Sequence, residues 1–150
     1  MAASRTLGRC ADAQVALGAG SIIVGLLLIF APRTGFFDSY NATVATAFWS
    51  TAALTEPAME MSHWLLATCG AGVVGWGVAW VAISHIPFRA GERWAWSCLL
   101  ASLLVWGVLD LGIAIWFGVT GEVIFVTATL VLALTPLVVS RSAVWTRNND

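Results

Sequence analysis

The feature that most constrains the fold is the segment from Glu56 to Ser84, which starts with polar residues and continues as a long apolar run. Pro57 falls in its first turn, where a missing backbone N–H costs a helix nothing. After His63 the chain carries no Asp, Glu, Lys or Arg until Arg89. A helix over this segment is roughly 40 Å long, more than the roughly 30 Å of a bilayer core. We therefore predict a transmembrane helix whose first two turns stand at or above the membrane surface.

Three more apolar runs have the length of a membrane crossing, over residues 13–31, 94–118 and 122–140. Pro32 ends the first run, and Pro136 is expected to bend the last one. Hydrophobic residues make up 59% of the chain and charged residues only 10%, against about 25% charged residues in a typical soluble domain. The sequence thus predicts an all-α membrane protein built as a bundle of four transmembrane helices.

The connection between the first two predicted helices contains a shorter helical pattern over residues 43–54. This pattern is too short and too polar to span a membrane, and lipid does not tolerate irregular backbone. We expect a short interfacial helix here, with aromatic side chains at the depth of the headgroups: Phe36, Phe37, Tyr40, Phe48 and Trp49. No linker or internal repeat divides the chain, so residues 1–150 are predicted to form one domain.

The arginines predict the orientation in the membrane. Only Arg33 falls on the side opposite the two termini, and the other six lie on the side of the termini: Arg5, Arg9, Arg89, Arg93, Arg141 and Arg147. Basic residues concentrate in cytoplasmic loops, so both termini are predicted to be cytoplasmic. The membrane is the plasma membrane in a bacterium or the endoplasmic reticulum in a eukaryote. The net charge of -1 leaves no basic patch for nucleic acid.

Asp110 is the single charge inside the third predicted helix. An unpaired carboxylate in hydrocarbon is costly, so this side chain should face the interior, be protonated or have a partner. One interpretation is a neutral carboxylic acid that donates a proton. The alternative is a structural hydrogen bond that joins the helix to a neighbour.

Three proton-active side chains share one face at the start of the second predicted helix, because Glu56, Glu60 and His63 are spaced i, i+4 and i+7. Glu60 and His63 together can act as a general base, directly or through one water. Glu56 has the alternative of simply favouring the helix dipole. Glu122 begins the fourth predicted helix. Two interpretations of it are equally supported: it favours the helix dipole in the same way, or it belongs to the site.

Small residues continue the face of Glu60 along the helix, at Ala67, Ala71, Gly75 and Ala79. Such a stripe lets a second helix or a flat ligand approach closely. Four tryptophans near the acidic end are candidates to line a pocket for an unsaturated ligand or to stabilise positive charge: Trp49, Trp64, Trp106 and Trp116.

Metal and covalent chemistry lack their usual signatures. The pattern of Glu56, Glu60 and His63 offers metal ligands, but a catalytic metal needs three well-placed ligands, and di-iron bundles need more Glu and His than this chain has. No nucleophile motif or phosphate loop is present. We expect no metal, no cofactor and no covalent intermediate.

In layout the chain resembles small four-helix membrane isomerases and cyclases, which include relatives of the sterol isomerases with EXPERA-type folds and epoxide-opening enzymes of terpene or polyketide pathways. The residues that carry the resemblance are Glu60, His63, Trp106 and Asp110. In this sequence the Glu precedes the His, whereas it follows the His in the sterol isomerases. The resemblance implies acid–base chemistry on a lipophilic substrate.

Two functional hypotheses follow. The first is a membrane-embedded acid/base enzyme that isomerises, cyclises or hydrolyses an alkene or epoxide in an isoprenoid-, sterol- or polyketide-like substrate. Asp110 protonates, Glu60 with His63 removes a proton or guides a hydroxyl or water, and Glu56 and Glu122 tune the pair. The alternative is a non-enzymatic, quinone- or lipid-binding accessory subunit of a membrane complex. The expected partners are the lipophilic substrate and membrane lipid, with self-association into a homo-oligomer as a further option.

Overall fold

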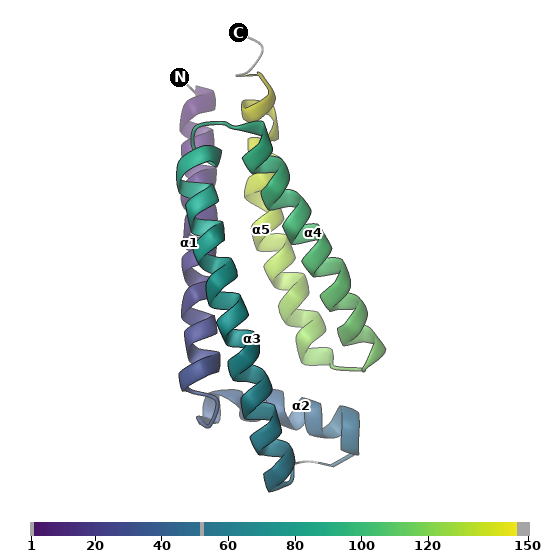
Figure 1. Ribbon diagram of the computed structural model, residues 1–150. Helices are drawn as coiled ribbons and strands as arrows, with labels where there is room; N and C mark the ends of the chain where they lie inside the picture. Colours follow the sequence, from purple (N-terminus) through teal and green to yellow (C-terminus); the bar gives the residue numbers. More distant parts are fainter. Residues whose placement is uncertain (1, 52, 147–150) are drawn as a thin grey trace.

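The computed structural model describes residues 2–51 and 53–146, and all the regular structure in them is helical. Figure 1 shows the order of the elements, which are α1 (Ala2–Phe30), the 3₁₀ helix η1 (Gly35–Phe37), α2 (Asp38–Trp49), α3 (Glu56–Ile83), the π-helix η2 (Ser84–Phe88), α4 (Arg93–Trp116) and α5 (Thr120–Thr146).

Four of these helices, α1, α3, α4 and α5, are long and apolar enough to cross a membrane. The prediction of an all-helical chain with four long apolar helices is therefore confirmed. Two of the helices are longer than the apolar runs indicated, since α1 begins at Ala2 and α5 continues to Thr146. These turns beyond the apolar runs are helical because they bury apolar side chains such as Leu7 and Val144 in the core.

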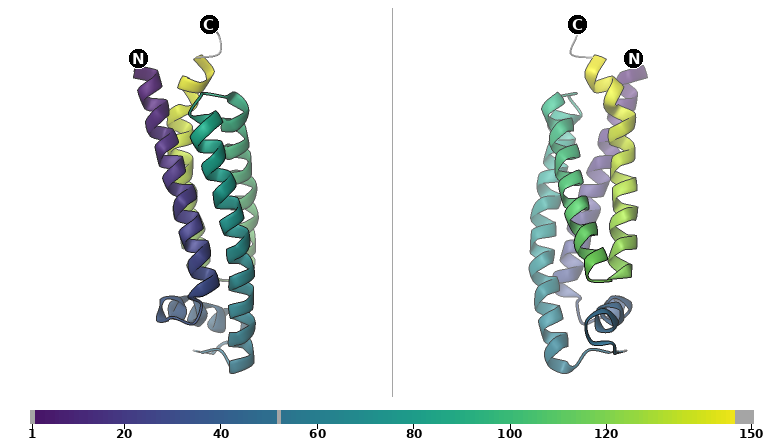
Figure 2. Two further views of the ribbon diagram at one scale, coloured as in Figure 1. Left: turned by 60° about the vertical axis from the view of Figure 1, so that its left-hand side comes forward. Right: turned by 90° about the vertical axis from the view of Figure 1, so that its right-hand side faces the viewer.

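The long helices form two pairs, α1 with α3 and α4 with α5, and α1 also packs on α5. Both termini lie at the same end of the bundle as η2, which joins α3 to α4 (Figures 1 and 2). The short helix α2 lies at the opposite end, across the end of the α4–α5 hairpin. The N-terminal turns of α3 extend past that hairpin.

Two pairs of glycines bring α1 and α3 into close contact. A Cβ on Gly70 would lie 2.6 Å from the carbonyl oxygen of Gly25, and a Cβ on Gly77 would lie 2.8 Å from that of Gly18. The predicted stripe does not receive a second helix at Gly75, where an added Cβ would meet no atom within 4 Å, and the alternative of a flat ligand there stays a prediction. The helix therefore turns the Gly70 face toward α1, and the predicted stripe lies beside it.

The helix α2 spans Asp38–Trp49, where residues 43–54 were predicted. Asp38 occupies the first turn, where a carboxylate favours the helix dipole. Ser50 ends the helix in the left-handed conformation, with φ of 53°. Buried Asn41 holds α2 against α3, because Ser62 donates a hydrogen bond of 3.1 Å to its side-chain oxygen.

A buried polar group joins three of the long helices in the core. Gln14 of α1 donates from Nε2 to the carbonyl oxygen of Ala133 in α5 at 2.8 Å. Its Oε1 accepts a bond of 3.0 Å from the indole N–H of Trp80 in α3. Since an unpaired amide in an apolar core is costly, this arrangement specifies how the helices align.

Candidate functional site

Asp110 and Glu122 lie on either side of the turn in the α4–α5 hairpin. Asp110 lies in the last two turns of α4, Glu122 lies in the first turn of α5, and both residues are partly buried. The two carboxyl groups are close enough for their charges to interact. The reversal between the helices uses Gly118 in the left-handed conformation, with φ of 71°, which is why so short a turn suffices.

Tyr40 of α2 completes this group. Burial raises the pKa of the Tyr40 phenol above its ordinary value, and the negative charges of Glu122, Cys69 and Asp110 raise it further. These interactions place the phenol near both carboxyl groups, with Cys69 contributed by α3. The cluster of Tyr40, Asp110 and Glu122, which we call the carboxyl cluster, therefore draws on three helices.

An open cavity of about 340 Å³ lies between α2 and the α4–α5 turn, and none of the three residues of the carboxyl cluster lines it. Its lining is rich in threonine and small residues: Ala42, Thr43, Thr46, Ala47, Gly118 and Thr120. The hydroxyls of Thr43 and Thr46 donate to backbone carbonyls of α2, so their oxygens remain available as acceptors. The cavity can thus accommodate a small polar group or water against these threonine oxygens.

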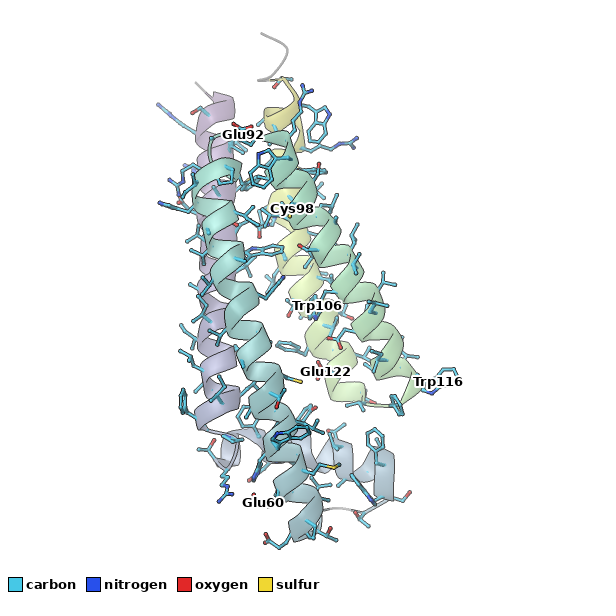
Figure 3. The ribbon with its side chains drawn as sticks, in the orientation of Figure 1. Glu60, Glu92, Cys98, Trp106, Trp116 and Glu122 are labelled. Carbon is cyan, nitrogen blue, oxygen red and sulfur yellow. The ribbon has the colours of Figure 1, made fainter. Side chains whose placement is uncertain are left out.

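Glu60 lies on the part of α3 that extends past the hairpin, away from Glu122 (Figure 3). One guanidinium nitrogen of Arg33 donates to both of its carboxylate oxygens, at 2.8 and 2.9 Å. The two side chains are 71% and 57% exposed, respectively. Glu56 is also exposed, in the first turn of α3. These two acids face the end of the bundle and do not join the carboxyl cluster.

The expected contact between Glu60 and His63 is not formed. The Glu60 carboxylate instead accepts two charge-assisted hydrogen bonds from the Arg33 guanidinium. Both ring nitrogens of His63 are buried, and neither has a hydrogen-bond partner in the part of the chain that the structure describes. His63 is therefore separated from the acid that was expected to orient it.

The four candidate tryptophans lie in different surroundings. Trp106 of α4 is partly buried and packs on Trp76 of α3, with ring centroids 6.1 Å apart. Trp116 is 85% exposed and points away from the bundle (Figure 3), and Trp64 is 65% exposed. Trp49 is 48% exposed and contacts Phe48. Only Trp106 lies inside the bundle, one helical turn from Asp110.

Three polar side chains were not identified from the sequence as part of the interior. Tyr40 was assigned to the interface, although it is the only tyrosine of the chain. Gln14 interrupts an apolar run in the same way as Asp110, which is a signal that could have found it. Asn41 is buried as well. Within residues 2–51 and 53–146, no group of three or more His, Cys, Asp or Glu side chains is arranged to hold a metal ion.

Fold and site together define a small helical protein with four potential membrane-spanning helices and a carboxyl cluster at the end opposite the termini. Comparisons with protein-family models, with curated proteins and with solved structures find no match.

Proposed function

We propose that the protein is an integral membrane enzyme with both termini in the cytoplasm, and that its carboxyl cluster performs acid–base chemistry on a lipophilic substrate. The substrate class is an isoprenoid-, sterol- or polyketide-like molecule with an alkene or an epoxide. The observation that supports this proposal is that Asp110 and Glu122 lie on either side of the α4–α5 turn, both partly buried, and that their charges act on one another or on the phenol of Tyr40.

Two adjacent carboxyl groups tend to share one proton, because two like charges at short range are unfavourable. One group then serves as an acid while the other serves as a base. In an alkene isomerisation, Asp110 protonates one carbon of the double bond, which leaves the positive charge on the other carbon. Glu122 then takes a proton from the next carbon along the chain, beside the cation, and the double bond re-forms one position further on. A proton passing from Glu122 back to Asp110 restores the starting state, so the cycle is balanced. Each such group contributes a rate factor of about 100 to 10,000.

The distribution of charge supports the orientation. Arg5, Arg9 and Arg141 are exposed at the end that holds the termini, and Arg89 pairs there with Asp12. Arg33 at the other end is paired with Glu60. Arg147 lies outside the described residues. Fusing a periplasm-active reporter enzyme to the C-terminus tests the orientation, and an active reporter would contradict it.

The chemistry is tested with Asp110→Asn and Glu122→Gln, which keep the shape of each side chain. Purified protein in lipid is incubated in D₂O with a panel of isoprenoid alkenes and epoxides, and mass spectrometry follows deuterium in the product. We expect each variant to lose at least about 100-fold in rate. Glu60→Gln is the matched control and should keep its activity. Unchanged turnover by Asp110→Asn would exclude the proposed acid.

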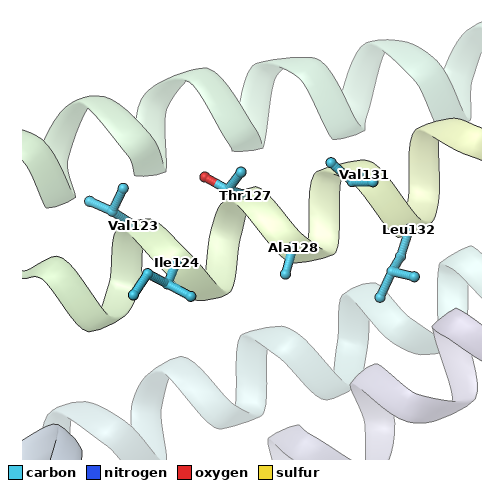
Figure 4. Close-up of a pocket in the computed structure, with 6 residues that line it drawn as sticks. All are labelled: Val123, Ile124, Thr127, Ala128, Val131 and Leu132. Atoms are coloured by element: carbon cyan, nitrogen blue, oxygen red, sulfur yellow. The ribbon is translucent and has the colours of Figure 1, made fainter.

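A second candidate is the non-enzymatic accessory subunit that binds a quinone or a lipid. A shallow apolar groove of about 590 Å³ favours it, and one face of α5 supplies its lining (Figure 4): Val123, Ile124, Thr127, Ala128, Val131 and Leu132. In that case Asp110→Asn should reduce co-purification with a partner complex, while no alkene or epoxide is converted by the unaltered protein.

A further inference from the structure

His63 is a buried titratable side chain that the proposed chemistry does not use. A neutral imidazole always carries one N–H donor and one acceptor nitrogen. Both of its nitrogens are buried without a hydrogen-bond partner among the described residues. Because burial of unpaired polar atoms is costly, a hydrogen-bond partner at this imidazole would stabilise the folded protein.

The packing of α1 on α3 shows where His63 lies. Gly18 faces Gly77 and Gly25 faces Gly70, so moving seven residues forward in α1 corresponds to moving seven residues backward in α3. Moving seven residues further in each segment pairs Pro32 with His63, and α1 has already ended at Phe30. The imidazole therefore lies where the glycine-lined contact between the two helices ends.

In the proposed membrane location, the Arg33–Glu60 ion pair indicates the depth of His63. The Arg33–Glu60 ion pair is exposed and lies one helical turn toward the end of the bundle. Three residues of α3 separate Glu60 from His63, or about 4.5 Å along the axis. The polar layer on each side of a bilayer core is roughly 5 to 8 Å thick. With the ion pair in that layer, His63 is placed at its inner boundary, where carbonyl groups of lipophilic molecules are available.

The site of His63 is distinct from the carboxyl cluster. Cys69, the α3 residue whose charge acts on Tyr40, is six residues further along the same helix. Six residues correspond to a rotation that leaves the two side chains roughly 120° apart around the axis. His63 thus points to a different side of α3 from the cluster.

We propose that His63 binds a lipophilic molecule through that molecule's carbonyl oxygen, with the imidazole N–H as the donor. Two sources present this chemistry at this depth, the ester group of a phospholipid and the ring carbonyl of a quinone. The residue as a whole is only partly buried, although both ring nitrogens are buried. A half-turn of the ring exchanges each nitrogen with a ring carbon, and in the proposed complex this rotation turns the N–H toward the ligand.

The test uses the fact that the chain contains two histidines. His85 lies in η2 at the other end of the bundle and is exposed, so it serves as an internal reference. The protein is labelled with ¹⁵N-histidine and placed in nanodiscs of diether phospholipid, which has no carbonyl group. Parallel samples contain ester phospholipid, or diether phospholipid with added decylubiquinone. His63→Gln and His85→Gln assign the signals.

We expect the ring ¹⁵N signals of His63 to shift when a carbonyl is supplied, while those of His85 stay unchanged. A shift in ester lipid alone identifies phospholipid as the source, and a shift only with decylubiquinone identifies a quinone. Identical His63 signals in all three samples would overturn the proposal, since the imidazole would then be bonded within the protein or to water.

A second measurement separates binding from folding. His63→Leu removes the imidazole and leaves an apolar side chain of similar size, so the helices should still assemble. For the carbonyl source that moved the signals, we expect affinity to fall about tenfold, the size of one hydrogen bond. His85→Leu should leave the affinity unchanged. Equal affinity of His63→Leu and the unaltered protein would also refute the site, and neither result depends on the activity of Asp110.

Discussion

Substitution of Gly70 by alanine should weaken the contact between α1 and α3. The added Cβ would lie 2.6 Å from the carbonyl oxygen of Gly25 and 2.9 Å from the Cβ of Leu28. Ordinary contact begins at 3.4 Å, so the two helices must separate locally by about 0.8 Å. Neither opposing atom belongs to the flexible end of a side chain, so only a backbone movement relieves the overlap.

The expected change in the free energy of unfolding follows from the packing contacts that are lost. A gap of 0.5 to 1 Å loses about a quarter to a half of each dispersion contact that it opens. Between membrane helices these contacts are a main source of association, because lipid is as apolar as the side chains. We expect Gly70→Ala to lower the free energy of unfolding by about 1 to 3 kcal/mol, the usual range for overpacking.

The matched control is Gly75→Ala on the same helix, where a Cβ meets no atom within 4 Å. Both substitutions gain the same helix propensity, about 1 kcal/mol, so their difference isolates the packing cost. Unfolding is followed by circular dichroism as SDS is added to mixed micelles. A double variant, Gly25→Ala with Gly70→Ala, should cost less than the sum of the two, because the first separation makes room for the second Cβ. Equal stability of Gly70→Ala and Gly75→Ala would refute this account of the helix contact.

Two further predictions concern the buried polar groups. Gln14→Leu leaves the indole N–H of Trp80 and the carbonyl of Ala133 without their present partner, so we expect a loss of about 1 to 3 kcal/mol in the same unfolding assay; an unchanged stability would show that the amide is not needed. Because Tyr40 is the only tyrosine, its ionisation can be followed by ultraviolet absorbance, and its pKa should lie above 10.0 and fall in Glu122→Gln. The fold disfavours the phenolate, so the free energy of unfolding should decrease as the pH rises above 10.0 and through the pKa of the folded state, and a pKa at or below 10.0 would contradict the burial of Tyr40 beside the acids.

The sequence was sufficient to predict the four long helices, because each carries an apolar run of membrane-spanning length. The predicted lengths of α1 and α5 were too short, since hydropathy does not show that Leu7 and Val144, outside the apolar runs, are buried in the core.

The shift of α2 from its predicted bounds also has a local cause. Its limits depend on Asp38 and on the left-handed Ser50, which are local features weaker than the aromatic pattern that guided the prediction.

The candidate site could be predicted only where the partners are close in the chain. Asp110 and Glu122 lie on either side of one short turn, so any antiparallel hairpin puts them at the same end of the bundle. Glu60 was assigned to His63 because the two share a helix face, yet Arg33, from a loop far away in sequence, binds its carboxylate instead. Helical spacing shows which residues share a face, but it does not show which charged group from another element will reach that face.

The same reasoning explains why the packing face of α3 was missed although a signal was present. Four glycines, at 70, 72, 75 and 77, offer several small faces, and periodicity within one helix does not choose among them. The choice is made by α1, whose Gly18 and Gly25 are seven residues apart, the same spacing as Gly70 and Gly77. Two antiparallel helices approach most closely when small residues face each other over successive turns. Among the glycine spacings that the two helices share, only seven residues is close to two full turns and keeps both glycines of each helix on one face. The packing face of an apolar helix is thus a property of two segments together, and matching the spacing of small residues between segments is the comparison that can predict it.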